Sequence, residues 1–254
     1  MTAGLEGKVA VVTGGGSGLG EAIARRLGAN GCTVVVAGRR RPPLDAVAAA
    51  IGGLAVTTDI RDEAQVQALF GACEAAYGRL DVLVNNAGIT GPTAPAEEMD
   101  AAAWDETFAV NARGTLLCIK HAMGLLRSGG GAIVNMSSRV GLYGKPARSA
   151  YAASKFAICA ITESVAAEAG RWGVRVNSVC PGGVDTALFR SVVTARAEKK
   201  GVATDALLKA EYLDSAALGR LVSADDVADA VMFLAGAEAA AITGEHILVD
   251  AGRS

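Results

Sequence analysis

Apolar residues gather in seven short runs that are spaced along the whole chain and are rich in β-branched side chains. The runs cover residues 8–13, 32–37, 54–59, 80–85, 131–136, 174–179 and 246–250. Each run is almost continuously apolar, which is typical of strands that are covered on both faces. Ala- and Leu-rich stretches with charges on one side separate them. The stretch from Asp62 to Gly78, for example, predicts a helix with an aspartate N-cap and a C-terminal glycine.

This alternation of strands and helices predicts the fold class. Successive βαβ units produce parallel strands with helices on both faces of the sheet. We therefore predict an α/β fold, a single Rossmann-like domain over residues 1–254 with a doubly wound, parallel, seven-stranded sheet. Residues 187–217 depart from the alternation because they are helical and charged and follow the sixth strand. Open α/β sheets bind ligands at that edge, so we interpret this segment as a substrate lid.

Composition narrows the classes of partner. The chain has 254 residues, 51% hydrophobic and 20% charged, and a net charge of −2, which favours a globular protein without a nucleic-acid or membrane partner. No apolar run approaches the roughly 20 residues that span a bilayer, and the first residues do not resemble a secretion signal. Five scattered cysteines and two distant histidines indicate a reducing compartment and no metal site. We expect a cytoplasmic protein.

A glycine-rich stretch, TGGGSGLG at residues 13–20, lies between the first predicted strand and a predicted helix. Glycines allow a tight turn and a close approach to a ligand, and the following helix N-terminus presents free N–H groups to an anion. A turn without a ligand is the alternative interpretation, but it needs fewer glycines. We therefore predict that this stretch binds the pyrophosphate of a dinucleotide.

Tyr151 and Lys155 stand four residues apart, so they share one face of a predicted helix. A nearby ammonium favours the phenolate and lowers the pKa of a tyrosine, so this pair can exchange a proton with an alcohol or carbonyl oxygen. Ser138 ends the fifth strand and can bond the same oxygen. The alternative interpretation is an ordinary amphipathic helix with a surface lysine. We disfavour it because Ser138 and the glycine turn are predicted at the same edge of the sheet.

Taken in order, these motifs resemble the short-chain dehydrogenase/reductase family. The resemblance covers about residues 5–252, nearly the whole chain. It includes a TGxxxGxG pattern at Gly14, Gly18 and Gly20, NNAG at 85–88, VNARG around Asn111, Ser138, a YxxxK pair at Tyr151 and Lys155, and PGGVDT at 181–186.

The resemblance implies roles for particular residues. Tyr151 would act as general acid/base, and Lys155 would lower the pKa of Tyr151 and hold the nicotinamide ribose. Ser138 would orient the substrate oxygen, and Asn111 would support a water that links Lys155 to solvent. The implied cofactor-binding residues are Gly14, Gly16, Ser17, Gly18, Leu19, Gly20, Arg39, Asp59, Ile60, Asn86, Ala87, Gly88, Tyr151, Lys155, Pro181, Gly182, Val184 and Thr186. Members of the family commonly form homodimers or homotetramers, and we expect one of these.

The end of the second strand bears on the choice of cofactor. In dinucleotide sites an acid there bonds the ribose hydroxyls of NAD, whereas an arginine accommodates the 2′-phosphate of NADP. Gly38 occupies the usual position of the acid, and Arg39 follows it. We therefore predict that NADP is preferred over NAD, with Arg39 as the phosphate ligand, Arg40 as second choice and Arg41 at the surface.

These inferences predict an NAD(P)-dependent alcohol dehydrogenase or carbonyl reductase that interconverts a small secondary alcohol and a ketone. A 3-oxoacyl thioester reductase, a sugar or polyol dehydrogenase and an enzyme of steroids or cyclic ketones remain open, as does a non-catalytic dinucleotide sensor. Four residues between Ser138 and Tyr151 could bind an acidic group on the substrate, although an exposed surface is the favoured interpretation. They are Arg139, Tyr143, Lys145 and Arg148.

Overall fold

The computed structural model describes residues 4–253, so the predicted domain limits at residues 1 and 254 lie outside the described residues. Its seven strands form one parallel sheet in the order β3-β2-β1-β4-β5-β6-β7. The strands are β1 (Val9–Thr13), β2 (Thr33–Gly38), β3 (Leu54–Thr57), β4 (Val82–Asn85), β5 (Gly131–Met136), β6 (Val174–Pro181) and β7 (His246–Val249). All seven predicted strands are confirmed. The order reverses between β1 and β4, the point at which doubly wound sheets bind their ligands.

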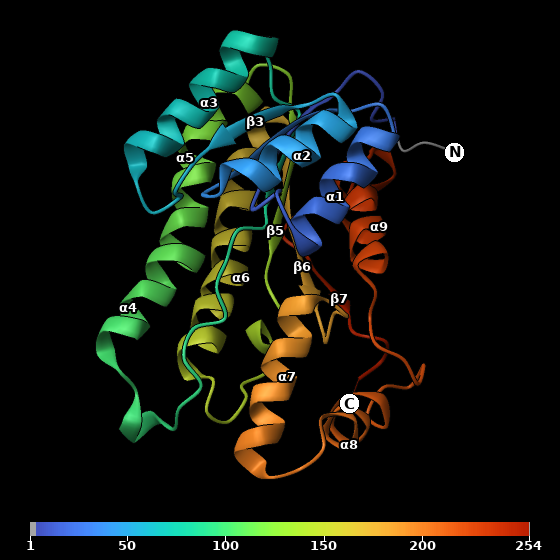
Figure 1. Cartoon of the computed structure of the whole chain (residues 1–254). Coiled ribbons are helices and arrows are strands. Elements are labelled where there is room, and N and C mark those ends of the chain that lie inside the picture. Colours follow the sequence, from blue (N-terminus) through green and yellow to red (C-terminus); the bar gives the residue numbers. More distant parts are fainter. Residues whose placement is uncertain (1–3, 254) are drawn as a thin grey trace.

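Helices cover both faces of the sheet (Figure 1). They are α1 (Gly18–Ala29), α2 (Arg41–Ile51), α3 (Glu63–Tyr77), α4 (Ala101–Phe108), α5 (Gly114–Leu126), α6 (Ser149–Ala169), α7 (Ala187–Lys200), α8 (Thr204–Leu208) and α9 (Ala224–Ala235). The core on one face is shared with α1, α2 and α9, and the core on the other with α3, α5 and α6. Alternate residues of β1 enter opposite cores, Ala10 and Val12 on one side and Val9 and Val11 on the other. This explains the almost continuously apolar strands.

Local signals set the helix ends as predicted. The Asp62 carboxylate accepts hydrogen bonds from the backbone N–H groups of Ala64 and Gln65, and Gly78 ends α3 in the left-handed conformation with φ of 67°. The two prolines after the three arginines lie in the first turn of α2. Proline is tolerated there because the N–H groups of the first turn have no partner within the helix.

Residues 187–217 form α7, α8 and a π-helical turn at Lys209–Leu213, which confirms their predicted helical character. The segment has a small hydrophobic core of its own, formed by Val193, Ala197, Leu207 and Tyr212. Figure 1 shows α7 and α8 at one end of the molecule, beyond the ends of β6 and β7. An isolated bridge joins Ala216, near the end of this segment, to Arg253, and a second bridge joins Val184 and Val222, which flank the segment.

The closest backbone approach at the start of α1 lies between Gly20 and the preceding turn. A Cβ atom on Gly20 would collide with the Gly14 carbonyl oxygen and the Asn86 amide. We therefore expect Gly20→Ala to lower the free energy of unfolding by about 1–3 kcal/mol, measured by urea denaturation. Gly71 in α3 is the matched control, because no described atom lies within 4 Å of a Cβ built there. Gly71→Ala should stabilise the protein by up to about 1 kcal/mol. Equal effects of the two substitutions would contradict this account.

Candidate active site

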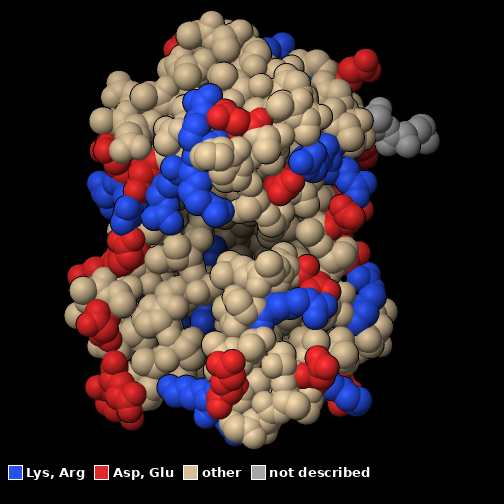
Figure 2. Space-filling model, viewed as in Figure 1, with Lys and Arg blue, Asp and Glu red and all other residues tan. Residues whose placement is uncertain are grey.

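A large cavity opens at the carboxyl ends of the strands, on both sides of the reversal between β1 and β4. Its volume is about 1280 Å³, above the roughly 300–1,000 Å³ of most small-molecule sites, so it can hold a dinucleotide together with a second molecule. Figure 2 shows a hollow near the middle of this face of the molecule, with Lys and Arg side chains at its rim. Every residue predicted to bind the cofactor or to act in catalysis lines this cavity, apart from Asn111.

The glycine turn is joined to the end of β4 by two polar side chains. Thr13 Oγ1 accepts hydrogen bonds from the backbone N–H groups of Asn86 at 3.0 Å and Ala87 at 3.1 Å. In return, the Asn86 amide donates to the Thr13 carbonyl at 2.9 Å. Asn86 therefore holds the turn in place as well as lining the cavity. Thr13 was missed as a site residue, although a hydroxyl at the end of an otherwise apolar strand was a signal in the sequence.

The start of α1 has the features of an anion site. Gly14 and Gly18 adopt positive φ of 67° and 54°, conformations that favour glycine, and α1 begins at Gly18. Within residues 4–253, the side chain of the N-cap residue Ser17 does not cap the helix. Its hydroxyl instead accepts a hydrogen bond from Arg40 at 3.2 Å. The first N–H groups of α1 are therefore available to a phosphate, and these residues fit the pyrophosphate of a dinucleotide.

The end of β2 carries exposed arginines. Arg39 lines the cavity and makes no ion pair with the residues that the structure describes, whereas Arg41 is exposed and pairs with Asp45 at 2.7 Å. The predicted surface position of Arg41 is confirmed. A Cβ on Gly38 would make only ordinary contact with Leu44 at 3.6 Å. A Cβ atom therefore fits at position 38, and packing does not demand the glycine.

Asp59, one of the predicted cofactor-binding residues, lies two residues beyond β3. Its carboxylate binds the Arg61 guanidinium, which also pairs with Glu106 at 2.6 Å. Hydrogen bonds from Arg61 hold the pKa of Asp59 below its usual value, and the Arg39 cation adds to the effect. Asp59 is therefore an anion at neutral pH, held beside Ile60 at the rim of the cavity.

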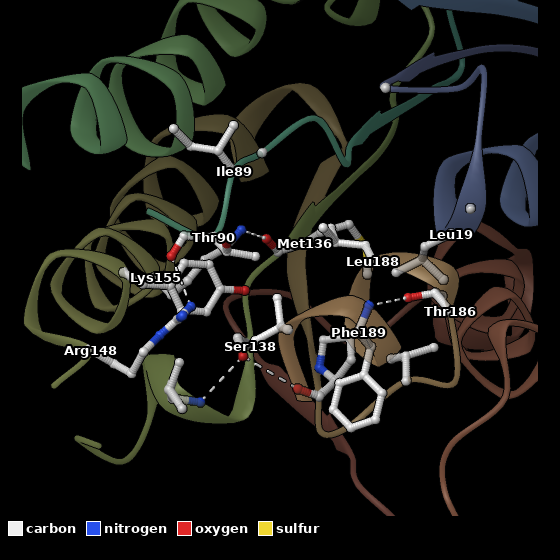
Figure 3. Close-up of a pocket in the computed structure, with 18 of the residues that line it drawn as sticks. Leu19, Ile89, Thr90, Met136, Ser138, Arg148, Lys155, Thr186, Leu188 and Phe189 are labelled. Atoms are coloured by element: carbon white, nitrogen blue, oxygen red, sulfur yellow. Dashed lines mark hydrogen bonds between the residues drawn. The ribbon is translucent and has the colours of Figure 1, made fainter. Parts of the chain in front are cut away.

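Tyr151 and Lys155 lie one turn apart at the start of α6, as predicted. Lys155 is only 5% exposed, and its ammonium donates to the Met136 carbonyl at 2.8 Å, as the dashed line in Figure 3 shows. Its Nζ lies 5.7 Å from the ring centroid of Tyr151. Burial lowers the pKa of Lys155 to about 8, since a buried ammonium loses its hydration.

The surroundings of Tyr151 correct one expectation about its pKa. Burial raises the pKa of Tyr151, and this effect is opposed by a hydrogen bond with Ser138 and by the Arg148 cation. The Arg148 guanidinium lies 4.7 Å from the centroid of the Tyr151 ring. The pKa of Tyr151 is therefore raised rather than lowered, and Ser138 and Arg148, not Lys155, oppose the effect of burial.

Ser138 lies just beyond β5 and joins the ends of two neighbouring strands. Its hydroxyl donates to the Pro181 carbonyl at the end of β6, at a long 3.5 Å, and accepts from the Val140 N–H at 3.4 Å (Figure 3). Both distances exceed those of strong hydrogen bonds. The Ser138 hydroxyl can therefore turn toward a substrate oxygen beside Tyr151 at little cost.

Asn111 is fully buried behind the cavity, in a π-helical turn at Ala109–Arg113 that joins α4 to α5. Its amide donates to the Ile89 carbonyl at 2.9 Å and to Ser154 Oγ at 3.0 Å, and accepts from the Ile89 N–H at 2.8 Å. Such turns are frequent at functional sites. These bonds fix the segment after β4 against α6. The implied water relay through Asn111 stays a prediction.

The basic segment between Ser138 and Tyr151 is not the exposed surface that we favoured. Arg139 pairs with the buried Asp250 at 3.1 Å. Arg148 donates to Thr93 Oγ1 at 2.9 Å and to the Thr90 carbonyl at 2.8 Å. Lys145 is 29% exposed and lies 3.8 Å from Glu211. The surface interpretation is therefore wrong for these three basic residues, and it fits only the exposed Tyr143.

Comparisons with known proteins agree with this geometry. The family profile described as short chain dehydrogenase matches residues 8–197. The chain belongs to this family. It is 39% identical to a cis-4-hydroxycyclohexanecarboxylate dehydrogenase of Sinomonas cyclohexanicum, over 96% of each chain. The short-chain dehydrogenase is accordingly an NAD(P)-dependent oxidoreductase that interconverts secondary alcohols and ketones.

Solved structures match the fold closely. A levodione reductase superimposes with a TM-score of 0.92 at 31% identity, covering 97% of each chain. A xylitol dehydrogenase with bound NAD+ also gives a TM-score of 0.92, at 27% identity, and covers 98% of this chain and 99% of its own. The predicted Rossmann-like architecture is confirmed by these likenesses.

The described residues contain neither a membrane-spanning helix nor a cluster of metal-ligating side chains. No helix among residues 4–253 is long and apolar enough to cross a membrane. The same residues contain no group of three His, Cys, Asp or Glu side chains placed to hold a metal ion. The five cysteines are buried, and none forms a disulfide among the described residues.

The bonds of Thr13 generate a prediction for the dehydrogenase. Thr13→Val removes the hydroxyl that accepts from two backbone N–H groups, and leaving such groups unpaired costs about 1–3 kcal/mol. We expect Thr13→Val to lower the free energy of unfolding by that amount and to weaken binding of the dinucleotide. Thr13→Ser keeps the hydroxyl and should retain both properties, measured by urea denaturation and by calorimetric titration. A valine variant that matches the serine variant in both measurements would refute the role of Thr13.

Proposed function

We propose that the protein is an NADP-preferring reductase or dehydrogenase in which Tyr151 transfers the proton. The observation that carries the proposal is the convergence of Tyr151, Ser138 and Lys155 on one cavity with the glycine turn. A non-catalytic sensor would have no use for a tyrosine hydroxyl placed beside Ser138 and a buried lysine. These groups together support a catalytic rather than a sensing role.

The residues present fit a dinucleotide along the whole cleft. The start of α1 would hold the pyrophosphate, and Asp59 and Ile60 would face the adenine. Pro181, Gly182, Val184 and Thr186 line the opposite wall and would hold the nicotinamide carboxamide. When bound, the nicotinamide supplies or accepts the hydride. Lys155 donates one hydrogen bond to Met136, so two of its three N–H groups remain for ribose hydroxyls.

The proton is moved by the chain's own residues. In ketone reduction, the Tyr151 hydroxyl donates its proton to the substrate oxygen while Ser138 donates a hydrogen bond to the same atom. The raised pKa of Tyr151 keeps that proton in place at neutral pH, which suits an acid. In alcohol oxidation, Tyr151 accepts the proton, and the Arg148 cation beside its ring stabilises the phenolate. A relay past Asn111 and Lys155 to solvent would restore the proton.

Arg39 supports the preference for NADP. It is exposed at the rim of the cavity, makes no ion pair with the described residues, and lies next to a glycine where a Cβ atom would fit. A planar guanidinium suits a phosphate. NAD remains the alternative, and the likeness to a xylitol dehydrogenase with bound NAD+ favours it.

Residues 187–217 would form a substrate lid on a single domain, and Leu188, Phe189 and Val192 line the cavity from this segment. Their apolar side chains suit the hydrocarbon body of a cyclic alcohol or ketone, in keeping with the name of the Sinomonas relative. This favours a cyclic substrate over the thioester and polyol alternatives. Leu116 on α5 and Phe156 on α6 are 48% and 45% exposed, and would lie in the interface of a homodimer or homotetramer. A cytoplasmic location stays our prediction.

Tyr151→Phe removes the proton that the substrate oxygen receives. We expect kcat/KM for ketone reduction to fall at least about 100-fold, the usual scale of acid–base catalysis. The dissociation constant of NADP+, measured by calorimetry, should change little. Tyr143→Phe is the matched control, because Tyr143 lines the same cavity with an exposed ring. A Tyr151→Phe enzyme as active as the Tyr143→Phe enzyme would rule out the proposed mechanism.

Arg39→Ala should reduce the preference for NADP. Loss of a charge-assisted bond to the 2′-phosphate costs about 1.5–3 kcal/mol, so the ratio of kcat/KM for NADPH over NADH should fall at least about tenfold. The binding preference should change in the same way: the dissociation constant of NADP+ should rise more than that of NAD+. Arg41→Ala, at an exposed arginine paired with Asp45, should leave the ratio unchanged. A wild-type enzyme that prefers NADH would show that the cofactor assignment is incorrect.

A further inference from the structure

The substrate side of the cavity carries an excess of positive charge. Lys145 and Arg148 reach it from the loop before α6, Arg196 from α7 and Arg253 from the C-terminal residues. We call these four residues the cation cluster. Glu211 is the only carboxylate among the described residues that line this side of the cavity. The local balance therefore contrasts with the net charge of −2 for the whole chain.

The single carboxylate is already engaged by other cations. Glu211 binds Arg196 at 2.6 Å and Lys200 at 2.7 Å, through different oxygens. Arg253 donates to the Glu211 backbone carbonyl at 2.7 Å, and its guanidinium lies 4.4 Å from the Tyr212 ring centroid. These bonds hold α7 to the following turn and to the C-terminus. They account for Arg196 and Arg253, and they leave Lys145 at 3.8 Å from the same carboxylate.

Arg148 is satisfied in its hydrogen bonds but not in its charge. Its guanidinium donates to Thr93 and to the Thr90 carbonyl, which are neutral acceptors (Figure 3). Within residues 4–253 no carboxylate lies within ion-pair distance of it. Among the described residues, neither Arg148 nor Lys145 donates a hydrogen bond to the segment 187–217, although Lys145 lies 3.8 Å from Glu211. The two cations face the cavity from the side that carries Tyr151.

Partly buried cations cost free energy when their charge is not balanced. Arg148 has no carboxylate partner among the described residues, and Lys145 shares Glu211 with Arg196 and Lys200. The effect is visible at Lys145, where burial and the Arg196 and Arg253 cations lower the pKa to about 8 although Glu211 opposes them. A bound anion would remove this cost. Because Arg148 lies over the Tyr151 ring, the anion would belong to a molecule whose reacting oxygen faces Tyr151.

We propose that the substrate is a hydroxy acid or oxo acid whose carboxylate binds between Lys145 and Arg148, while its hydroxyl or carbonyl oxygen faces Tyr151 and Ser138. This inference rests on the proposed oxidoreductase function and adds the substrate class. A carboxylate fits better than a phosphate dianion because Glu211 lies within the cluster and repels a second charge. Leu188, Phe189 and Val192 would contact the hydrocarbon between the two polar groups.

The test compares acids with neutral partners of the same shape. The enzyme is assayed for NADPH-dependent reduction of oxo acids with one to four carbons between carbonyl and carboxylate, including a ring compound. The methyl ester of each acid is assayed in parallel. We expect at least one acid to exceed its ester in kcat/KM about tenfold or more, the value of a charge-assisted bond. Ratios near one for every acid–ester pair would overturn the proposal.

Substitutions then locate the carboxylate. Lys145→Met should lower the acid-to-ester ratio at least about fivefold, while Lys145→Arg keeps the charge and most of the ratio. Lys209→Met is the matched control, because Lys209 lies in the same segment as Glu211 but pairs with Asp214 away from the cavity. A Lys145→Met ratio equal to that of Lys209→Met would overturn the assignment.

A binding measurement separates this inference from the proposed function. Calorimetric titration of the protein with each acid and its ester, with and without NADP+, requires no turnover. Binding of the acid in preference to the ester, lost in Lys145→Met, would support the carboxylate site even if no reduction occurred. Turnover of esters and acids at equal rates, with equal affinities, would uphold the oxidoreductase function and refute the carboxylate site.

Discussion

The buried ammonium of Lys155 determines how the catalytic end of the molecule is assembled. It donates to the Met136 carbonyl at 2.8 Å, and the next residue of the same strand end, Ser137, donates its hydroxyl to the Lys155 carbonyl at 2.9 Å. A charge that is 5% exposed must have such a partner. Side chain and backbone of one helical residue are thereby joined to the end of β5. These bonds set the position of α6 on the sheet and place Tyr151 beside Ser138.

The other half of the cleft is held by the same principle. Thr13 and Asn86 join the ends of β1 and β4, and Gly20 lets α1 approach the turn between them. Each half is therefore fixed by polar bonds at the carboxyl ends of parallel strands, where the backbone ladder stops. The cavity between the halves is a consequence of the strand order, which reverses at β1 and β4. This arrangement agrees with membership of the short-chain dehydrogenase family, which the family profile shows.

Charge is distributed very unevenly between the cavity and the remaining surface. The whole chain is slightly acidic, yet the cavity is lined by arginines at the cofactor end and by the cation cluster at the substrate end. This concentration of positive charge raises the local affinity of the cavity for anions. The repulsion between the like charges lowers the stability of the folded protein. Hydride transfer and a catalytic tyrosine are features that this protein shares with its family. The segment 187–217 and the loop before α6 line the part of the cavity where the substrate would bind.

The sequence by itself determined the strands, the helix ends and the pairing of Tyr151 with Lys155, because these features depend on neighbours within a few residues. Continuous apolar runs indicate burial on both faces. Asp62 caps the start of α3 and Gly78 caps its end, both by bonds to residues nearby in the sequence. Only the tertiary structure decided the partners of Asn111, the charges that act on Tyr151 and the pairing of Arg139 with Asp250, 111 residues away. The cation cluster likewise joins residues from 145 to 253. Such contacts depend on where distant segments meet, and no local periodicity encodes that meeting.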